Sequence, residues 1–133
     1  MRIKPRPLQA GDGLLRLGVE VYGGPILATF ADRDLGLAGR VAVRDGAGSA
    51  LRLVRFGEPL LRLPNLAIHM NREVNEGGLK FNKQTELPLT FGLAGDSGGG
   101  DGRFQALLAA RLAINPDDIL SWELNACDTQ PGA

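Results

Sequence analysis

The stretch VEVYGGPILATFADRDLGLAGRVAV, residues 19–43, contains two strand-like runs separated by a Gly-Gly-Pro break. Before the break, apolar residues occupy every second position from Leu15 to Val21, which is typical of a half-buried β-strand that ends at Gly23-Gly24. After the break the extended pattern resumes, and two alternating runs flank Asp45-Gly46, a strong β-hairpin signal. This stretch and its flanks therefore predict an antiparallel sheet.

The segments on either side of this sheet differ in pattern. Upstream, the two prolines of RIKPRP (Arg2 to Pro7) exclude a helix interior and predict an extended strand or a polyproline arm at a domain edge. Downstream of Pro59, apolar residues follow a helical spacing and predict a short helix from Pro64 to Arg72. An ordered loop then leads to a predicted strand from Leu87 to Leu93.

The C-terminal part begins with AGDSGGGDG, residues 94–102, which we expect to be a flexible glycine-rich loop. Asp101 is the expected N-cap of a helix with an apolar stripe formed by Phe104, Leu107, Leu108 and Leu112. After a turn at NPDD (Asn115 to Asp118), alternation predicts a closing strand from Ile119. The chain is thus mainly β with one or two short helices, and residues 1–133 form a single domain.

Charge and cysteine content exclude several classes of function. Fifteen Lys+Arg balance fifteen Asp+Glu, so the chain has no net field to hold a nucleic acid or an anionic membrane surface. The single cysteine, Cys127, cannot form an internal disulfide, and no apolar run is long enough for a membrane span or a signal-peptide core. We expect a cytoplasmic protein.

The sequence offers few groups for catalysis. One histidine and one cysteine are too few for a zinc site, although His69 and Glu73 lie four residues apart, a spacing that can place two ligands on one helix face. A histidine that is hydrogen-bonded to neighbouring backbone is the favoured interpretation. Cys127 lies in an alternating strand without a basic neighbour, which favours an inert thiol. We therefore predict no catalytic, cofactor-binding or metal-binding residue in this chain.

Other candidate groups have structural explanations. None of the three serines Ser49, Ser97 and Ser121 lies in the strained turn of a nucleophile elbow. GDSGGGDG lacks the lysine and the preceding buried strand of a phosphate-binding loop. Asp117-Asp118 lies where a helix dipole favours acidic residues without any catalytic role.

Three stretches, in order, resemble the middle portion of the aspartyl aminopeptidases, a family of dinuclear zinc aminopeptidases. They are VEVYGGPILATFADRDLGLAGRV, LLRLPNLAIHMNREVNEGGLKFNKQTELPL and DILSWELNACDTQPG, and the opening RIKP also fits. The resemblance covers nearly the whole chain apart from residues 45–56 and the glycine-rich loop.

The resemblance implies that this chain is the inserted lid and oligomerisation domain, and that the catalytic zinc domain is absent from it. Met1 directly before RIKP is expected to be the added start of an excised domain. The family's lid is a closed Greek-key β-barrel that assembles subunits into dimers and larger oligomers. The implied partners are a second copy of the chain, the parent's catalytic domain with its zinc ions, and peptide substrates with N-terminal aspartate or glutamate.

The resemblance also places a subunit-contact face, which faces the neighbouring active site, on the Gly-Gly and Asp-Arg-Asp stretch. Its residues are Tyr22, Gly23, Gly24, Ala28, Thr29, Phe30, Asp32, Arg33 and Asp34. Many family members have a histidine at the position of Ala28, and alanine cannot donate that hydrogen bond. For Asp32-Arg33-Asp34 we expect an arginine clamped between two carboxylates at a strand end.

Two further interpretations stay open at the sequence level. The chain could be a stand-alone β-barrel interaction module that holds a partner through an edge strand or the His69 helix. An independent hydrolase would require a metal or a nucleophile that the sequence does not offer. If the chain is an insertion, Ile3 to Pro5 should lie beside Asp128 to Gln130, because an insertion leaves and rejoins its host at one place.

Overall fold

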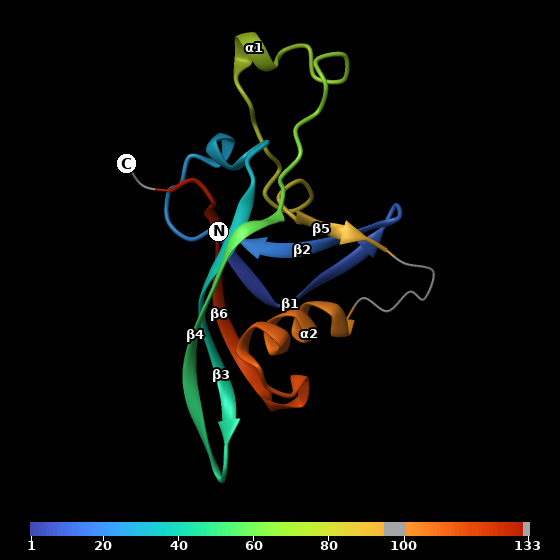
Figure 1. Cartoon of the computed structure of the whole chain (residues 1–133). Helices are drawn as coiled ribbons and strands as arrows, with labels where there is room; N and C mark the ends of the chain where they lie inside the picture. Colours follow the sequence, from blue (N-terminus) through green and yellow to red (C-terminus); the bar gives the residue numbers. More distant parts are fainter. Residues whose placement is uncertain (95–100, 132–133) are drawn as a thin grey trace.

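The computed structural model describes residues 1–94 and 101–131, which form one antiparallel six-stranded sheet with short helices (Figure 1). The strands are β1 (Arg2–Gly11), β2 (Leu14–Glu20), β3 (Leu35–Asp45), β4 (Gly48–Leu61), β5 (Leu89–Leu93) and β6 (Ile119–Asp128). The helical segments are η1 (Leu27–Phe30), α1 (Val74–Gly77), α2 (Asp101–Leu112) and η2 (Pro116–Asp118). The mainly β fold class is therefore confirmed.

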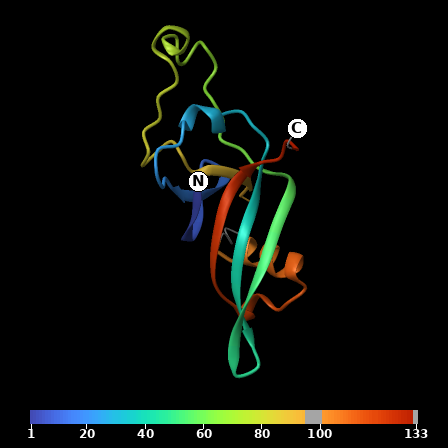
Figure 2. The same cartoon turned by 90° about the vertical axis from the view of Figure 1, so that its left-hand side faces the viewer.

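A long hairpin, β3–β4, is the largest regular unit. Asp45 pairs with Gly48, and Gly46 between them has a positive φ of 57°, so the hairpin predicted at Asp45-Gly46 is confirmed. β6 pairs with the other side of β3, and this gives the three long strands seen in Figure 2. Two residues of β3, Val41 and Val43, are buried in the core.

The sheet, in the order β4-β3-β6-β1-β2-β5, curls so that its two outer strands approach each other. They meet where Arg62 and Thr90 exchange two backbone hydrogen bonds, with N–O distances of 3.0 and 2.7 Å. A closed Greek-key barrel is not confirmed, because a single residue pair joins these strands. The sheet is a curled half-barrel.

Helix α2 covers the core between the two parts of the sheet (Figure 1). Phe104 is buried, and its ring lies edge-on to Trp122 of β6 at 5.5 Å and to Phe91 of β5 at 6.1 Å. Leu108 is also buried, which confirms the predicted apolar stripe. The expected cap at Asp101 and the flexible loop at residues 94–102 fall largely outside the described side chains and residues.

Two local predictions are wrong. Residues 64–72 form turns and irregular backbone, and α1 begins only at Val74. Within the described part of the chain, the apolar side chains of this segment have no other element to pack against. A helix with this spacing would therefore bury no apolar surface. The extended run expected after Gly24 is likewise replaced by an irregular loop that contains η1.

The first and last strands lie side by side, but in a different register from the one predicted. The Ala126 amide donates to the Met1 carbonyl at 2.8 Å, and the Trp122 indole donates to the Lys4 carbonyl at 3.3 Å. Lys4 therefore lies beside Trp122 and not beside residues 128–130. Among the described helices, none is long and apolar enough to cross a membrane.

Candidate subunit-contact surface

The predicted contact residues all lie on one loop, residues 21–34, which we call the β2–β3 loop. It leaves β2 through Gly23, whose φ of 76° allows the chain to turn away from the sheet. Tyr22 is 93% exposed and Ile26 is 72% exposed, so the loop presents two large apolar side chains to solvent. Such exposed groups mark sites of association when they cluster.

Helix η1 holds the middle of this loop in place. The backbone amide and the hydroxyl of Thr29 both donate to the Ile26 carbonyl, at 3.1 and 2.7 Å. Leu27 and Phe30 pack against the core, whereas Ala28 is exposed. The loop is therefore anchored from inside and presents Ala28 outward.

The predicted clamp of Arg33 between its two neighbouring aspartates is wrong. Arg33 forms an ion pair with Asp128 at the end of β6, while Arg62 lies 2.9 Å from Asp34 and 4.0 Å from Asp32. Asp32 has a positive φ of 54°, which turns the backbone here. Arg33 and the two aspartates therefore reach different partners. The cluster thus ties the loop to the ends of β4 and β6.

Backbone hydrogen bonds reinforce these ties. The Asp32 amide donates to the Leu63 carbonyl at 2.9 Å, and the Asn65 amide donates to the Asp32 carboxylate at 3.1 Å. On the other side, the Thr129 amide and hydroxyl donate to the Asp34 carbonyl at 3.2 and 2.9 Å. Exposed ion pairs contribute little stability, so these hydrogen bonds help to fix the loop geometry.

The carboxylate of Asp128 is the electrostatic anchor of this region. A hydrogen bond from the Gln130 amide, at 2.9 Å, is the largest cause that lowers the pKa of Asp128, and the Arg33 guanidinium adds to it. The lowered pKa favours the ionised carboxylate of Asp128, which is the form that pairs with the Arg33 guanidinium. Sequence reasoning missed Asp128, Thr129 and Arg62, because nothing local links them to the loop.

A second exposed segment adjoins the loop. Residues 64–88, which we call the arm, rise beyond the sheet and carry α1 (Figures 1 and 2). On the arm, Leu66 is 55% exposed, Ile68 is 45% exposed and Met70 is 73% exposed. The parallel bridge between Ala31 and Leu63 joins the loop to the base of the arm.

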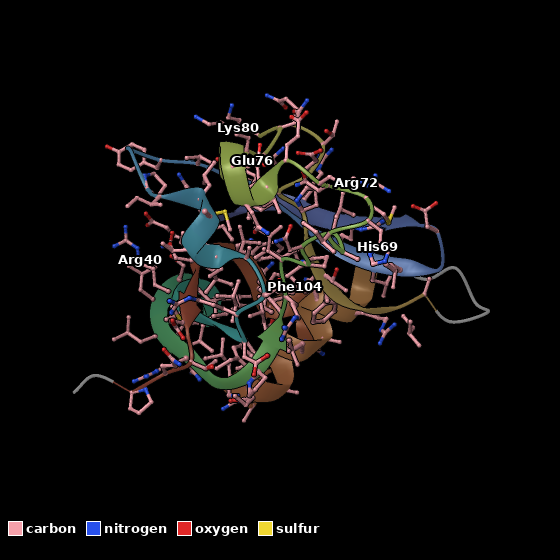
Figure 3. The ribbon with its side chains drawn as sticks, turned by 90° about the horizontal axis from the view of Figure 1, so that it is seen from above. Arg40, His69, Arg72, Glu76, Lys80 and Phe104 are labelled. Atoms are coloured by element: carbon pink, nitrogen blue, oxygen red, sulfur yellow. The ribbon has the colours of Figure 1, made fainter. Side chains whose placement is uncertain are left out.

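The charged side chains of the arm point into solvent. His69 and Arg72 appear on one side of it, and Glu76 and Lys80 on the other (Figure 3). His69 is exposed in a turn and Glu73 precedes α1, so the two do not lie on the face of one helix, the arrangement that their spacing would have allowed. The interpretation of a histidine hydrogen-bonded to backbone also finds no partner for His69 among the described contacts.

Among the described residues, no set of side chains fits zinc. Within residues 1–94 and 101–131, no group of three or more His, Cys, Asp or Glu side chains converges closely enough to hold a metal ion. Cys127 is a free, half-buried thiol. We derive no reaction step through a metal from these residues.

The comparison with known families then gives a clear result. A family described as "Aminopeptidase I zinc metalloprotease (M18)" matches residues 1–133. The chain belongs to the M18 family. An M18 relative, a probable M18 family aminopeptidase 2 of Streptomyces avermitilis, is 46% identical over 124 residues, which cover 93% of this chain and 28% of the relative.

Solved structures of M18 proteins agree with the fold. A cryo-EM structure of a complex of Ape4 and Nbr1 matches with a TM-score of 0.89 and 36% identity, covering 97% of this chain and 28% of that one. The S. cerevisiae mApe1 dodecamer matches with a TM-score of 0.70 and 21% identity, covering 97% of this chain and 28% of that one. The chain thus spans about three tenths of the M18 proteins it matches.

Proposed function

We propose that this M18 chain is the lid and subunit-assembly domain of a cytoplasmic zinc aminopeptidase that removes N-terminal acidic residues from peptides. The observation that carries the proposal is the match of the whole chain to M18, combined with a span of only 28% of its Streptomyces relative. The donor-poor side chains of the described residues support the assignment of zinc and catalysis to the parent's catalytic domain.

The surface described above supports the assembly role. Tyr22 and Ile26 project from a loop that hydrogen bonds hold on both sides, so association would not have to order a flexible segment. We propose that this loop forms an isologous contact in a dimer, the commonest way to bury one patch. The structurally similar mApe1 of S. cerevisiae is a dodecamer, and further contacts would extend our dimer to a larger assembly.

The curled sheet supports the lid role. Its outer strands already meet at Arg62 and Thr90, which is compatible with a barrel of Greek-key type once the remaining edge is covered. Ala28 is exposed on η1, at the position where the resemblance places a histidine that reaches the neighbouring active site. The alanine side chain has no hydrogen-bond donor, so we propose that this position contributes only apolar surface to the neighbouring active site.

Self-association of the purified chain tests the assembly role. We expect light scattering to show a dimer whose dissociation constant rises at least about ten-fold in the double variant Tyr22→Ser/Ile26→Ser, because two anchors of the contact are removed. Leu93→Ser is the matched control, since Leu93 is also 72% exposed but lies on β5. A concentration-independent monomer, or equal weakening by the control, would contradict the proposed interface.

A further inference from the structure

The far end of the molecule carries a second exposed surface, along the outer edge of β4. β4 is the outermost strand of the sheet, and within the described residues only β3 pairs with it from Gly48 to Phe56. The β3–β4 hairpin extends away from the body, at the end opposite the arm (Figures 1 and 2). An unpaired strand edge is a template for another extended chain.

This edge is apolar where a protected edge would be polar. Leu51 is 66% exposed and Leu53 is 84% exposed, and their spacing places both on one face of β4. Leu51 also lines a surface groove of about 640 Å³ that continues over Arg40 and Ala42 of β3. The exposed leucines therefore border a groove of mixed polar and apolar lining on the face of the sheet.

The same edge carries cations without partners. Two other arginines of the hairpin are paired: Arg40 lies 2.6 Å from Glu123, and Arg44 lies 3.8 Å from Asp118. Arg52 and Arg55 form no ion pair within the described part of the chain. Because they are three residues apart in a strand, they lie on opposite faces.

We propose that the outer edge of β4 binds an extended acidic segment of a different protein by strand addition. Main-chain hydrogen bonds to the edge would supply affinity. Leu51 and Leu53 would contact apolar side chains on one face of the added strand, while Arg52 and Arg55 select carboxylates on either face.

The arginines also explain why the partner is not a second copy of this edge. Two β4 edges paired about the segment from Leu51 to Arg55 would bring four guanidinium groups into one short ribbon, and like charges across strands are destabilising. Arginines that only guard the edge against association would not explain the two exposed leucines beside them. The combination fits an acidic partner strand.

Peptide binding to the purified chain tests this inference. The probes are a capped peptide of alternating valine and glutamate in which one terminal valine is also glutamate, so that both faces carry a carboxylate, and its counterpart with lysine at every glutamate position. Binding is followed by calorimetry and by NMR shifts of backbone amides. We expect only the acidic peptide to bind, with the largest shifts in residues 48–56 and weaker binding at higher salt. Equal binding of both peptides, no binding, or shifts centred elsewhere would overturn the proposal.

Variants separate the two parts of the recognition. Arg52→Glu/Arg55→Glu and Leu51→Ser/Leu53→Ser should each lower affinity for the acidic peptide at least about ten-fold. The control Arg72→Glu/Lys83→Glu makes the same change of charge on the arm and should alter affinity by less than about two-fold. If the control weakens binding as much, or if the leucine variant changes nothing, strand addition at β4 is contradicted. This test does not depend on self-association of the chain. A monomeric chain would contradict the assembly role but would leave the peptide-binding result unchanged, so the two proposals can fail separately.

Discussion

At the scale of single residues, the β2–β3 loop is held by partners far away in sequence. Arg33 pairs with Asp128, and Arg62 reaches both Asp32 and Asp34. Each ion pair is exposed and worth little alone. Their positions at the ends of β4 and β6 nevertheless define where the loop lies, and this orientation decides which side chains the surface presents.

One glycine marks a position where the fold tolerates no side chain. A Cβ on Gly36 would lie 2.1 Å from the Phe56 carbonyl oxygen, far inside contact distance. We expect Gly36→Ala to lower the free energy of unfolding by about 2–3 kcal/mol, because β3 and β4 must separate to admit a methyl group.

Chemical denaturation measures this effect against a matched control. Gly24 has no heavy atom within 4 Å of its hypothetical Cβ, so Gly24→Ala should change stability by less than about 0.5 kcal/mol. If the two variants were equally stable, the result would contradict the close approach of β3 to β4 at Gly36.

The exposed carboxylates respond differently to loss of their arginines. The side-chain hydrogen bond from Arg40 is the largest cause that lowers the pKa of Glu123, and the charge of Arg40 comes next. For Asp128 the Gln130 amide comes first. We therefore expect Arg40→Gln to raise the pKa of Glu123 by more than Arg33→Gln raises that of Asp128, as measured by NMR titration.

The sign of the linked stability follows from the lowered pKa values. A carboxyl group with a depressed pKa contributes stability that is present above its unfolded pKa and lost as pH falls through its folded pKa. The stability difference between the wild type and Arg40→Gln should therefore exist at neutral pH and vanish in acid. A difference that grows in acid would contradict this assignment.

At the scale of elements, the sequence predicts the helices and strands whose pattern is local. It does not predict elements whose burial depends on contacts with residues far away in the sequence. The β3–β4 hairpin, β5, β6 and α2 form where the sequence predicted them. In β6 the register shifts near its start, so that Ile119 is buried and Leu120 is exposed, against the alternation. Residues 64–72 have helical spacing but no packing surface, so the helix does not form. The residues of the candidate surface were named from the sequence, but as part of an extended run and not as a loop. Their partner Arg62 was not predicted, because only the curl of the sheet brings it to the loop.

The arm is the element most open to attack. Most of its residues 64–88 are exposed, with Leu87 buried at its end, and its only helix, α1, spans four residues. We expect trypsin to cleave first after Arg72, Lys80 or Lys83, at least about ten-fold faster than after Arg52 or Arg55 in the paired strand β4. Mass spectrometry of early fragments gives the order, and first cleavage within the hairpin would contradict it.

At the scale of the whole molecule, the two surfaces that we propose for recognition lie at opposite ends of the fold. The β2–β3 loop and the arm lie at one end, and the free edge of β4 lies at the other (Figure 1). Phe104 packs between them against both parts of the sheet. This arrangement suits a domain that positions other chains, and its described side chains provide no convergent metal ligands.

The most direct measurement of this account combines zinc analysis of the purified chain with an aminopeptidase assay on an aspartyl anilide. We expect less than stoichiometric zinc and no turnover above background, because our proposal assigns the ligands and the catalytic groups to another domain of a parent enzyme. Stoichiometric zinc together with hydrolysis of the anilide by this chain alone would contradict the assignment of a lid and assembly domain.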